Sequence, residues 1–523
     1  MTRRTDRRAG SAAVAEPAGG RTHVVAVIVP EPADAVPLVE REAPGAEIAV
    51  VCLRSGTKEG RAALDRALTA AGSRGCRVLG GPRIVDVQGR DAVAALLAEL
   101  REIDPERLHT LDPDPTHVSV DEATGVPGYD VPLAHTEAAA HALAAARARQ
   151  TETGRPLYVD CLRAQATPGP GAASARRYPM PVNWLSAGFD GRLTAFLPTA
   201  AGVVRWHEQT PGGAWRGPEP VEGAGLAPGL LVIADPRGLP HLFGLRRTTR
   251  DDGGVDVEVV HAAQYRTGRP LTPWLPLGGP NARAWNKGRE VGFPAAAFDT
   301  AGNLFVFVRN FGHSISWRRQ SADGGWTDWQ HLSGVKVADD LVAVTSAHGG
   351  VEVFARARDT EATVRWYPGP DGTFREDRGL PFAARPGTLA PAPEPGAVVY
   401  CDLHSGEAAV WRPGAPAPCP LGGSPGRPAA VRGVEIDGWL YSVLVAPGAD
   451  GTCSVGAYPE GRPDAGVWWQ DLGAPSYGAP TAAVSRSGRL TVATRIPGGR
   501  LLLARRQENR DGLVFDDWEP AGH

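Results

Sequence analysis

The chain has 523 residues, 42% of them hydrophobic and 22% charged, which is typical of a globular protein long enough for at least two domains. Its formal net charge of −3 gives no indication of a nucleic acid or an anionic membrane as a partner. No stretch approaches the ~20 apolar residues of a membrane span, and residues 1–20 contain arginines but no apolar signal core. We therefore expect a cytoplasmic protein with a disordered segment at 1–20.

The tryptophans divide the chain, because all 14 lie at or after Trp184. This asymmetry predicts two modules, with a first domain at 21–165, a linker at 166–182 and a second domain at 183–523. The six cysteines show no CxxC spacing, which favours buried thiols over a disulfide framework or a zinc knuckle. The abundance of alanine, arginine, glycine and proline is typical of a GC-rich bacterial genome.

Strands alternate with helices in the first module. Continuous apolar runs at 23–29 and 46–53 predict strands that are buried on both faces. Apolar residues at helical spacing predict helices at 59–71 and 90–102, and an alanine-rich stretch predicts another at 136–149. The alternation indicates an α/β domain with a mostly parallel sheet, whose functional site lies beyond the carboxyl ends of the strands. The segment directly after the first strand is therefore the first candidate.

That segment carries Val29, Pro30, Glu31 and Pro32. The order of elements resembles the PIG-L (LmbE-like) family of zinc-dependent N-deacetylases, whose first strand ends in Ala-His-Pro-Asp-Asp. The resemblance places Val29 at a zinc-binding histidine, Glu31 at the general base and Pro32 at a zinc-binding aspartate. A catalytic zinc needs about three protein ligands and an open position, and neither valine nor proline offers a lone pair. The resemblance therefore implies a degenerate pocket.

The second motif of that family, His-x-Asp-His at the start of a late helix, resembles residues 129–143. One register places His135 on the third zinc ligand. A register shifted by three keeps His135 as the first histidine and Glu137 as the acid, but loses the ligand at Ala138. At most one of three ligands remains in either register, so we expect no zinc-dependent hydrolysis and no cofactor. Glu31 and His135 remain as candidates for a vestigial or repurposed acid/base pair.

Residues with oxygen and nitrogen donors are dense between positions 109 and 122. The six are His109, Asp112, Asp114, His117, Asp121 and Glu122. Together with His135 they could rebuild a metal site. The simpler interpretation, which we favour, is a solvated loop in which aspartate and proline set the turns.

The second module repeats a closing element of the form Trp-x-x-Leu-Gly. It appears at Trp274, Trp329, Trp469 and Trp518, with weaker versions at Trp215, 378–380 and 419–422. These seven units follow one another at a spacing of about 50 residues, with short alternating strands and Gly/Asp turns between them. The pattern predicts a seven-bladed all-β propeller, in which the ring must close because no single repeat buries both of its faces.

This region resembles the propeller of sugar-binding lectins that carry one tryptophan-rich motif per blade. The resemblance implies a saccharide or a glycosylated small molecule as the partner, bound in clefts between blades. Trp326, Trp468 and Trp469 are the candidates for stacking against a sugar. The simpler interpretation of any single tryptophan is packing between blades.

Three functions stay open from the sequence. The first, which we favour, is a catalytically degenerate PIG-L-like domain that carries a carbohydrate-binding or scaffold propeller. The second is an N-deacetylase or amide hydrolase of an amino sugar or glycosylated metabolite, with zinc held at His135 in a rebuilt site. The third is a metal-independent tailoring enzyme of specialised metabolism that uses Glu31 and His135 as acid and base.

Overall fold

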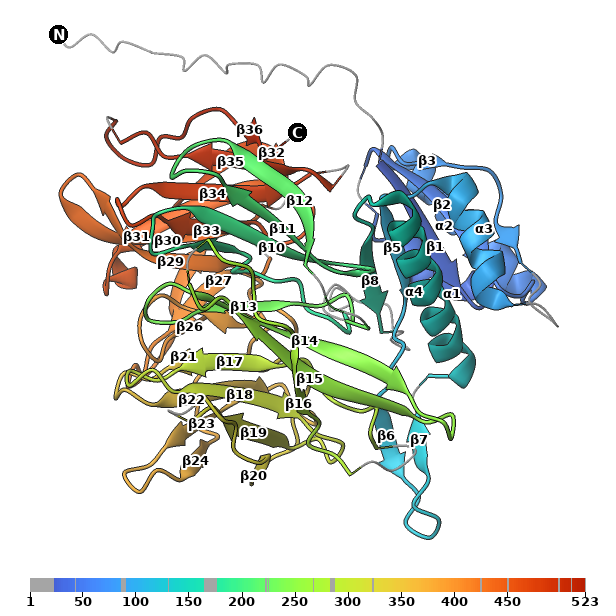
Figure 1. Cartoon of the computed structure of the whole chain (residues 1–523), viewed down its shortest axis with the longest axis horizontal. Helices are drawn as coiled ribbons and strands as arrows, with labels where there is room; N and C mark the ends of the chain where they lie inside the picture. The colour runs from blue at the N-terminus through green and yellow to red at the C-terminus, as the bar shows by residue number, and fades with distance from the viewer. Residues whose placement is uncertain are drawn as a thin grey trace.

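The computed structural model shows an α/β domain that lies against a ring of β-sheets (Figure 1). It describes residues 23–42, 44–85, 91–129, 131–163, 176–221, 223, 225–266, 268–282, 287–321, 324–423, 426–448, 451–496, 499–508 and 510–522. The disorder expected at 1–20 and most of the linker expected at 166–182 lie outside the described residues. The two predicted fold classes, α/β and all-β, are both confirmed.

The sheet of the α/β domain has the strand order β3-β2-β1-β5-β8, and its paired strands run parallel. A sixth strand, the short β4, pairs with β2, and a hairpin of β6 and β7 stands apart from the sheet. Strands β1 and β2 are apolar and buried along almost their whole length, as expected for a parallel sheet covered on both faces. The strands are β1 His23–Val29, β2 Ala46–Cys52, β3 Arg77–Val78, β4 Arg83–Ile84, β5 Arg107–Leu111, β6 His117–Val120, β7 Pro127–Tyr129 and β8 Tyr158–Leu162.

Four helices cover the sheet: α1 Pro32–Val39, α2 Lys58–Ser73, α3 Ala92–Ile103 and α4 Leu133–Thr153. The three predicted helices are present with shifts of one to four residues at their ends. Side-chain caps fix two of the starts, because Thr57 Oγ1 accepts a hydrogen bond from Gly60 N and Asp91 Oδ1 accepts one from Val93 N. Helix α1 was not predicted, since two prolines interrupt its pattern and its helical part spans only eight residues.

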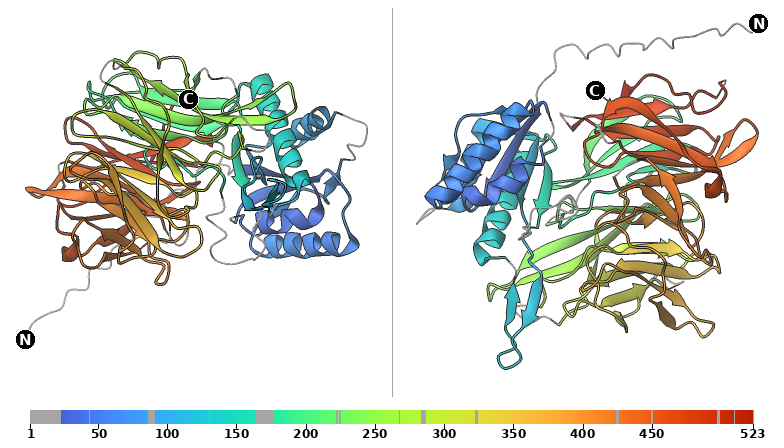
Figure 2. Two further views of the ribbon diagram at one scale, coloured as in Figure 1. Left: turned by 90° about the horizontal axis from the view of Figure 1, so that it is seen from below. Right: turned by 180° about the vertical axis from the view of Figure 1, so that it is seen from behind.

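Helix α4 lies beside α3 on one face of the sheet, where it contacts β5 and β1, and its many alanines suit this close packing (Figure 2). Small side chains let a helix approach two neighbours at once. Its far end also makes polar contacts with the propeller, because Arg147 Nη2 donates a 3.0 Å hydrogen bond to Leu226 O. In addition, Gln150 Nε2 donates a 2.9 Å hydrogen bond to Thr199 Oγ1. One apolar core cluster joins residues of both domains, so the two domains share part of their packing.

The propeller has seven blades, and each blade is an antiparallel sheet of four consecutive strands. Blades 1 and 2 comprise β9 Leu185–Ala187, β10 Leu193–Thr199, β11 Gly202–Glu208, β12 Trp215–Val221, β13 Leu231–Ala234, β14 Pro240–Thr249, β15 Val255–Ala263 and β16 Leu275–Gly278. Blades 3 and 4 comprise β17 Ala295–Phe298, β18 Leu304–Arg309, β19 Ile315–Arg319, β20 Gln330–Leu332, β21 Val342–Thr345, β22 Val351–Arg356, β23 Thr363–Pro368 and β24 Phe374–Asp377. The last three blades comprise β25 Ala390–Pro391, β26 Val398–Cys401, β27 Ala408–Trp411, β28 Cys419–Gly422, β29 Ala429–Ile436, β30 Trp439–Pro447, β31 Thr452–Pro459, β32 Trp468–Pro475, β33 Thr481–Val484, β34 Leu490–Arg495, β35 Leu501–Arg505 and β36 Glu519–Pro520, with a 3-10 helix at Pro463–Ala465.

The first strand of each blade is innermost, since these strands contact one another from blade to blade. The Gly-x-Leu segments of the sequence repeat form the second strands, as in β10 and β34. The closing segment expected at 378–380 was placed too late, because the outer strand of blade 4 is Phe374–Asp377. Inner strands such as Ala295–Phe298 are short and rich in small residues, so they carry no repeat signal of their own.

The repeated tryptophan and leucine connect neighbouring blades. Trp469 Nε1 donates a 2.9 Å hydrogen bond to Leu421 O of the preceding blade, and Trp518 Nε1 donates a 2.7 Å hydrogen bond to Leu472 O. The acceptors Leu421 and Leu472 are themselves the leucines of the preceding closing element. The closing tryptophans of blades 3, 6 and 7 thus each donate to the preceding blade, which gives a physical reason for the repeat there. In contrast, Nε1 of Trp215 and that of Trp274 have no such partner among the described residues.

The ring closes between blades 7 and 1 without exchange of a strand, because each of these blades is continuous in sequence. Trp184 Nε1 donates a 2.9 Å hydrogen bond to Ala479 O, and apolar residues of the two blades share one buried cluster. All six cysteines are unpaired, and five of them are buried. No helix in the described part of the chain is long and apolar enough to cross a membrane.

Candidate functional site

The carboxyl end of β1 holds the residues that the family resemblance singled out. Val29 is buried in the core, and Pro32 begins α1 and is also buried, so neither position offers a ligand atom. His135 lies in the first turn of α4, where its Nε2 is 3.1 Å from Asp34 Oδ1. The other carboxylate oxygen of Asp34 accepts a 3.1 Å hydrogen bond from Glu31 N. The carboxylate of Asp34, which sequence reasoning had not named, therefore contacts the ring of His135 and the backbone N–H of Glu31.

The carboxyl end of β5, further along the same sheet edge, is built differently. Asp112 and Asp114 follow this strand and are 5% and 3% exposed, so the expectation of a solvated loop is wrong for them. His109 is buried within β5, with its ring nitrogens 3.1 Å from Glu42 Oε1 and 3.3 Å from Asp160 Oδ2. Asp121 and Glu122 are exposed at the tip of the β6–β7 hairpin, as a solvated turn requires.

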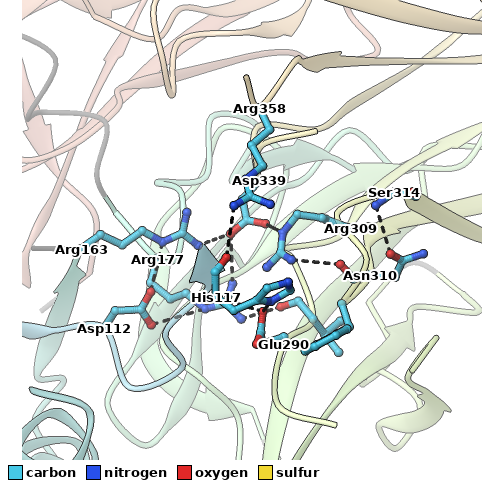
Figure 3. A network of polar contacts seen from close by, with 12 residues as sticks. Asp112, His117, Arg163, Arg177, Glu290, Arg309, Asn310, Ser314, Asp339 and Arg358 are labelled. Atoms are coloured by element: carbon cyan, nitrogen blue, oxygen red, sulfur yellow. Dashed lines mark hydrogen bonds and ion pairs between the residues drawn. The ribbon is translucent and has the colours of Figure 1, made fainter. Parts of the chain in front are cut away.

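Asp112 of the α/β domain and Asp339 of the propeller are joined by arginines (Figure 3). Arg163 Nε lies 3.1 Å from Asp112 Oδ2, and the same guanidinium contacts Asp339. Arg309 also contacts Asp339, and Arg177, which is 1% exposed, lies within 4.0 Å of both carboxylates. Burial opposes ionisation of Asp339, but the three arginines outweigh it and hold the pKa of that carboxyl well below its usual value. Burial dominates at Asp112 and raises the pKa of that carboxyl despite Arg163 and Arg177.

Asp114 makes a second connection to the propeller. Arg247 Nε from β14 lies 2.9 Å from Asp114 Oδ1, and Arg289 Nη2 donates a 2.9 Å hydrogen bond to Pro113 O. Burial would raise the pKa of Asp114, but Arg247, Arg177 and Arg289 lower it. Desolvated charges of this kind are tolerated only when each is paired, so the network requires that both domains be docked.

His117 begins the β6–β7 hairpin and lies against the propeller. Its Nδ1 is 2.7 Å from Glu290 Oε2, and its ring stacks on Phe311 at a centroid distance of 4.3 Å. The ring centroid of His313 lies 4.6 Å from that of His117, and His117, Glu290 and His313 are all buried. Burial, Arg309 and Arg358 lower the pKa of His313 to about 3, so its imidazole is neutral at physiological pH. Glu290 is 173 residues from His117 in the chain, and no motif in the sequence links them.

Two cavities adjoin this interface. One, of about 180 Å³, is bordered by His313, Arg309 and Arg358 of the propeller together with Arg163 and Asp112. The other, of about 350 Å³, surrounds the propeller axis on the side of the α/β domain. Its polar lining consists mainly of Arg176, Arg177, Asp339, Asp340, Arg385 and Arg427.

A larger cleft of about 460 Å³ lies between blades 7 and 1. It is on the face of the ring away from the α/β domain, because it is lined by the β9–β10 and β33–β34 turns, whereas α4 contacts the β10–β11 turn. Glu208 ends β11 and is 1% exposed; its Oε2 accepts a 2.9 Å hydrogen bond from Leu193 N, and its Oε1 is 3.5 Å from Arg505 Nη2 of blade 7. Phe189 at the rim is 59% exposed, with the Arg486 guanidinium 4.0 Å from its ring centroid.

The tryptophans chosen from the sequence occupy different environments. Trp468 is 83% exposed on β32, whereas its neighbour Trp469 is half-buried and donates the inter-blade hydrogen bond described above. Trp326 is half-buried, with its ring centroid 5.6 Å from that of His261 and the Arg318 guanidinium 5.8 Å above it. Their predicted role in stacking against a sugar stays a prediction.

The fold and the interface define a two-domain protein in which an α/β domain is docked on a seven-bladed propeller by buried ion pairs. No protein-family model and no curated protein matches the chain, so the resemblance to the PIG-L family stays a prediction.

Several solved structures are similar. The BP39L lectin from Burkholderia pseudomallei shares 15% identity at a TM-score of 0.46, over 65% of this chain and 99% of that one. A putative 6-phosphogluconolactonase from Bacteroides uniformis shares 15% identity at a TM-score of 0.42, over 64% and 97%. The SapL1 lectin in complex with alpha methyl fucoside shares 15% identity at a TM-score of 0.36, over 65% and 97%. At this identity the likeness concerns the fold alone.

Proposed function

We propose that the chain is a carbohydrate-binding protein, and that its saccharide site is the cleft between blades 7 and 1. The observation that carries the proposal is the meeting of Glu208 and Arg505 from neighbouring blades in a cleft of about 460 Å³. This volume falls in the usual range for small-molecule sites, about 300–1,000 Å³. A carboxylate and a guanidinium together accept and donate hydrogen bonds, which suits the adjacent hydroxyl groups of a sugar ring.

The rim adds the apolar component that a sugar needs. The exposed ring of Phe189 offers a flat surface to the C–H face of a pyranose, while Ser485 and Ser487 supply further hydroxyl groups. The Glu208 carboxylate is fixed by the backbone N–H of Leu193, so part of the site is already in place without ligand. Trp468 remains a separate candidate for stacking, because most of its ring is exposed.

The proposal assigns no zinc-dependent hydrolysis to the end of β1, since Val29 and Pro32 carry no ligand atoms. The α/β domain instead covers one face of the propeller. The two enzymatic hypotheses, a deacetylase with zinc at His135 and a metal-independent tailoring enzyme that uses Glu31 and His135, stay predictions.

The test is a glycan array probed with the full-length protein, followed by calorimetric titration of the strongest ligand. We expect Glu208→Gln and Arg505→Met each to weaken binding by at least about tenfold, which corresponds to roughly 1.4 kcal/mol. Arg319→Met is the matched control, because Arg319 occupies in blade 3 the strand position that Arg505 occupies in blade 7. Trp468→Ala tests the other candidate surface.

Unchanged affinity in both cleft variants would contradict the proposed binding site. A loss of affinity confined to Trp468→Ala would instead place the saccharide site on blade 6. Absence of binding to any glycan would contradict the proposed function itself. Thermal unfolding of each variant shows whether a lost affinity reflects a lost fold, because Glu208 is buried.

A further inference from the structure

Three side chains with metal-binding atoms meet where the β6–β7 hairpin contacts blade 3. They are His117 of the α/β domain, and Glu290 and His313 of the propeller. Their ligand atoms all lie within 4.8 Å of one another, and each residue is at most 6% exposed. No other group of this kind occurs among the described residues. In particular, none includes His135 at the end of β1.

One member of this group has no partner. Nε2 of His313 is buried and makes no hydrogen bond in the described part of the chain, and the same holds for Oε1 of Glu290. A buried polar atom without a partner loses its hydration and gains nothing in return. His313 also has a left-handed backbone with φ of 60°, which is uncommon outside glycine and marks a position held under strain. The unpaired buried atoms call for a ligand at this point.

We propose that His117, Glu290 and His313 bind one zinc-type transition-metal ion that connects the two domains. Two imidazoles and one carboxylate are the donor set of many zinc sites, whereas calcium and magnesium prefer oxygen ligands alone. Nδ1 of His117 and Oε2 of Glu290 are 2.7 Å apart and form a hydrogen bond. A bound ion would replace this hydrogen bond. Small side-chain rotations would then bring each of the three donor atoms to about 2.0–2.2 Å from the ion.

The surroundings are compatible with a bound cation. Two of the nearby arginines have carboxylate partners, since Arg309 contacts Asp339, and Arg289 Nε lies 3.9 Å from Asp114 Oδ1. A third, Arg358, donates a 2.8 Å hydrogen bond to Val118 O and lies on the wall of the adjoining cavity. On the hairpin, Tyr129 faces Glu290, and burial together with the charge of Glu290 raises the pKa of this tyrosine to about 12.

Three protein ligands leave at least one coordination position for water or a small ligand. The cavity of about 180 Å³ beside His313 provides space on that side, and Arg309 and Arg358 on its wall favour an anionic ligand. The site is therefore distinct from the saccharide cleft, which lies on the opposite face of the ring, and it does not depend on the proposed function.

The test measures zinc binding by the full-length protein after treatment with a chelator. We expect about one zinc ion per chain after equilibration with micromolar Zn²⁺ and desalting, and no displacement by excess Mg²⁺. Glu290→Gln and His313→Gln should each weaken the affinity more than about a hundredfold, beyond the loss seen for outer-shell partners. Co²⁺ in place of zinc should give the visible bands of a four-coordinate site, and both variants should abolish them.

His135→Gln is the matched control, because it changes a histidine of α4 that lies outside the group of three and should leave the zinc content unchanged. Glu290→Gln keeps a hydrogen-bond acceptor for His117, and its unfolding midpoint without metal shows whether the interface is still intact. The proposal is overturned if the wild type retains no zinc, or if zinc is lost in His135→Gln but retained in Glu290→Gln and His313→Gln.

Discussion

The carboxyl ends of β1 and β5 lie on the same edge of one sheet, yet only one of them is joined to the propeller. At β1, the contacts of Glu31, Asp34 and His135 stay within the α/β domain. At β5, Asp112 and Asp114 are buried against four arginines, and two of these, Arg247 and Arg289, belong to the propeller. The polar residues at the β1 end pair with one another, whereas those at the β5 end need arginines from the second domain to be buried.

The largest effect should come from removing a charge at the β5 end. Asp339→Asn leaves Arg163, Arg177 and Arg309 around a neutral amide, and breaking a buried ion pair on one side costs about 3–5 kcal/mol. We expect chemical denaturation to show this loss. The two domains should also begin to unfold in separate transitions, because the contacts that couple them are weakened.

Asp121→Asn is the control for this experiment. Asp121 is exposed at the hairpin tip and hydrogen-bonds only within its own turn, so the midpoint should stay close to that of the wild type. An Asp339→Asn protein as stable as the wild type would show that the network contributes little to docking.

The second effect depends on pH and concerns the start of β1. His23 is 5% exposed and contacts Tyr477 of the propeller, with His23 Nδ1 3.0 Å from the tyrosine hydroxyl. Burial lowers its pKa to about 4, despite the opposing charge of Glu42. In the unfolded chain the pKa is about 6.5, so this contribution to stability is present above pH 6.5 and is lost as the pH falls towards 4.

Between pH 7 and pH 5 this histidine should therefore reduce the free energy of unfolding by about 2 kcal/mol, at 1.36 kcal/mol per pH unit. The difference between wild type and His23→Phe, measured by denaturant titration at both pH values, isolates this term from the other titrating groups. Equal pH dependence in the two proteins would show that His23 is already charged, or is hydrated, in the folded state.

The sequence was sufficient to predict the elements whose pattern is local. Apolar runs predicted β1 and β2, helical spacing predicted α2 and α3, and the repeated tryptophan predicted seven blades. Helix α1 was missed because Pro32 and Pro37 conceal its pattern. The first strands of the blades were missed because they are short and carry no repeated motif.

The polar interface could not be predicted for a different reason. Asp112 and His117 were noticed, but their partners Arg163 and Glu290 are 51 and 173 residues away, and no spacing rule connects them. A run of aspartates and prolines is usually a solvated turn. In this protein, the docking of the propeller buries the run, including Asp112 and His117.

A smaller effect distinguishes structural from exposed tryptophans. Trp518→Phe removes the hydrogen bond from Trp518 Nε1 to Leu472 O, which should cost about 1 kcal/mol and lower the melting temperature. Trp468→Phe is the control and should change stability by less than about 0.5 kcal/mol, because this side chain is 83% exposed. If both substitutions cost the same, the repeat does not act through inter-blade hydrogen bonds.

An effect of similar size should come from the β1 end, where Asp34→Asn removes the carboxylate that contacts the His135 ring and the Glu31 backbone N–H. The Asp34 and His135 side chains are 19% and 15% exposed, so water screens the pair more than it screens the β5 network. Loss of a negative charge in the first turn of α1 further lowers the free energy of unfolding, by about 0.3–1 kcal/mol. We expect denaturant titration to show a total loss of about 1 kcal/mol. A cost as large as that of Asp339→Asn would mean that Glu31, Asp34 and His135 form a tightly coupled site.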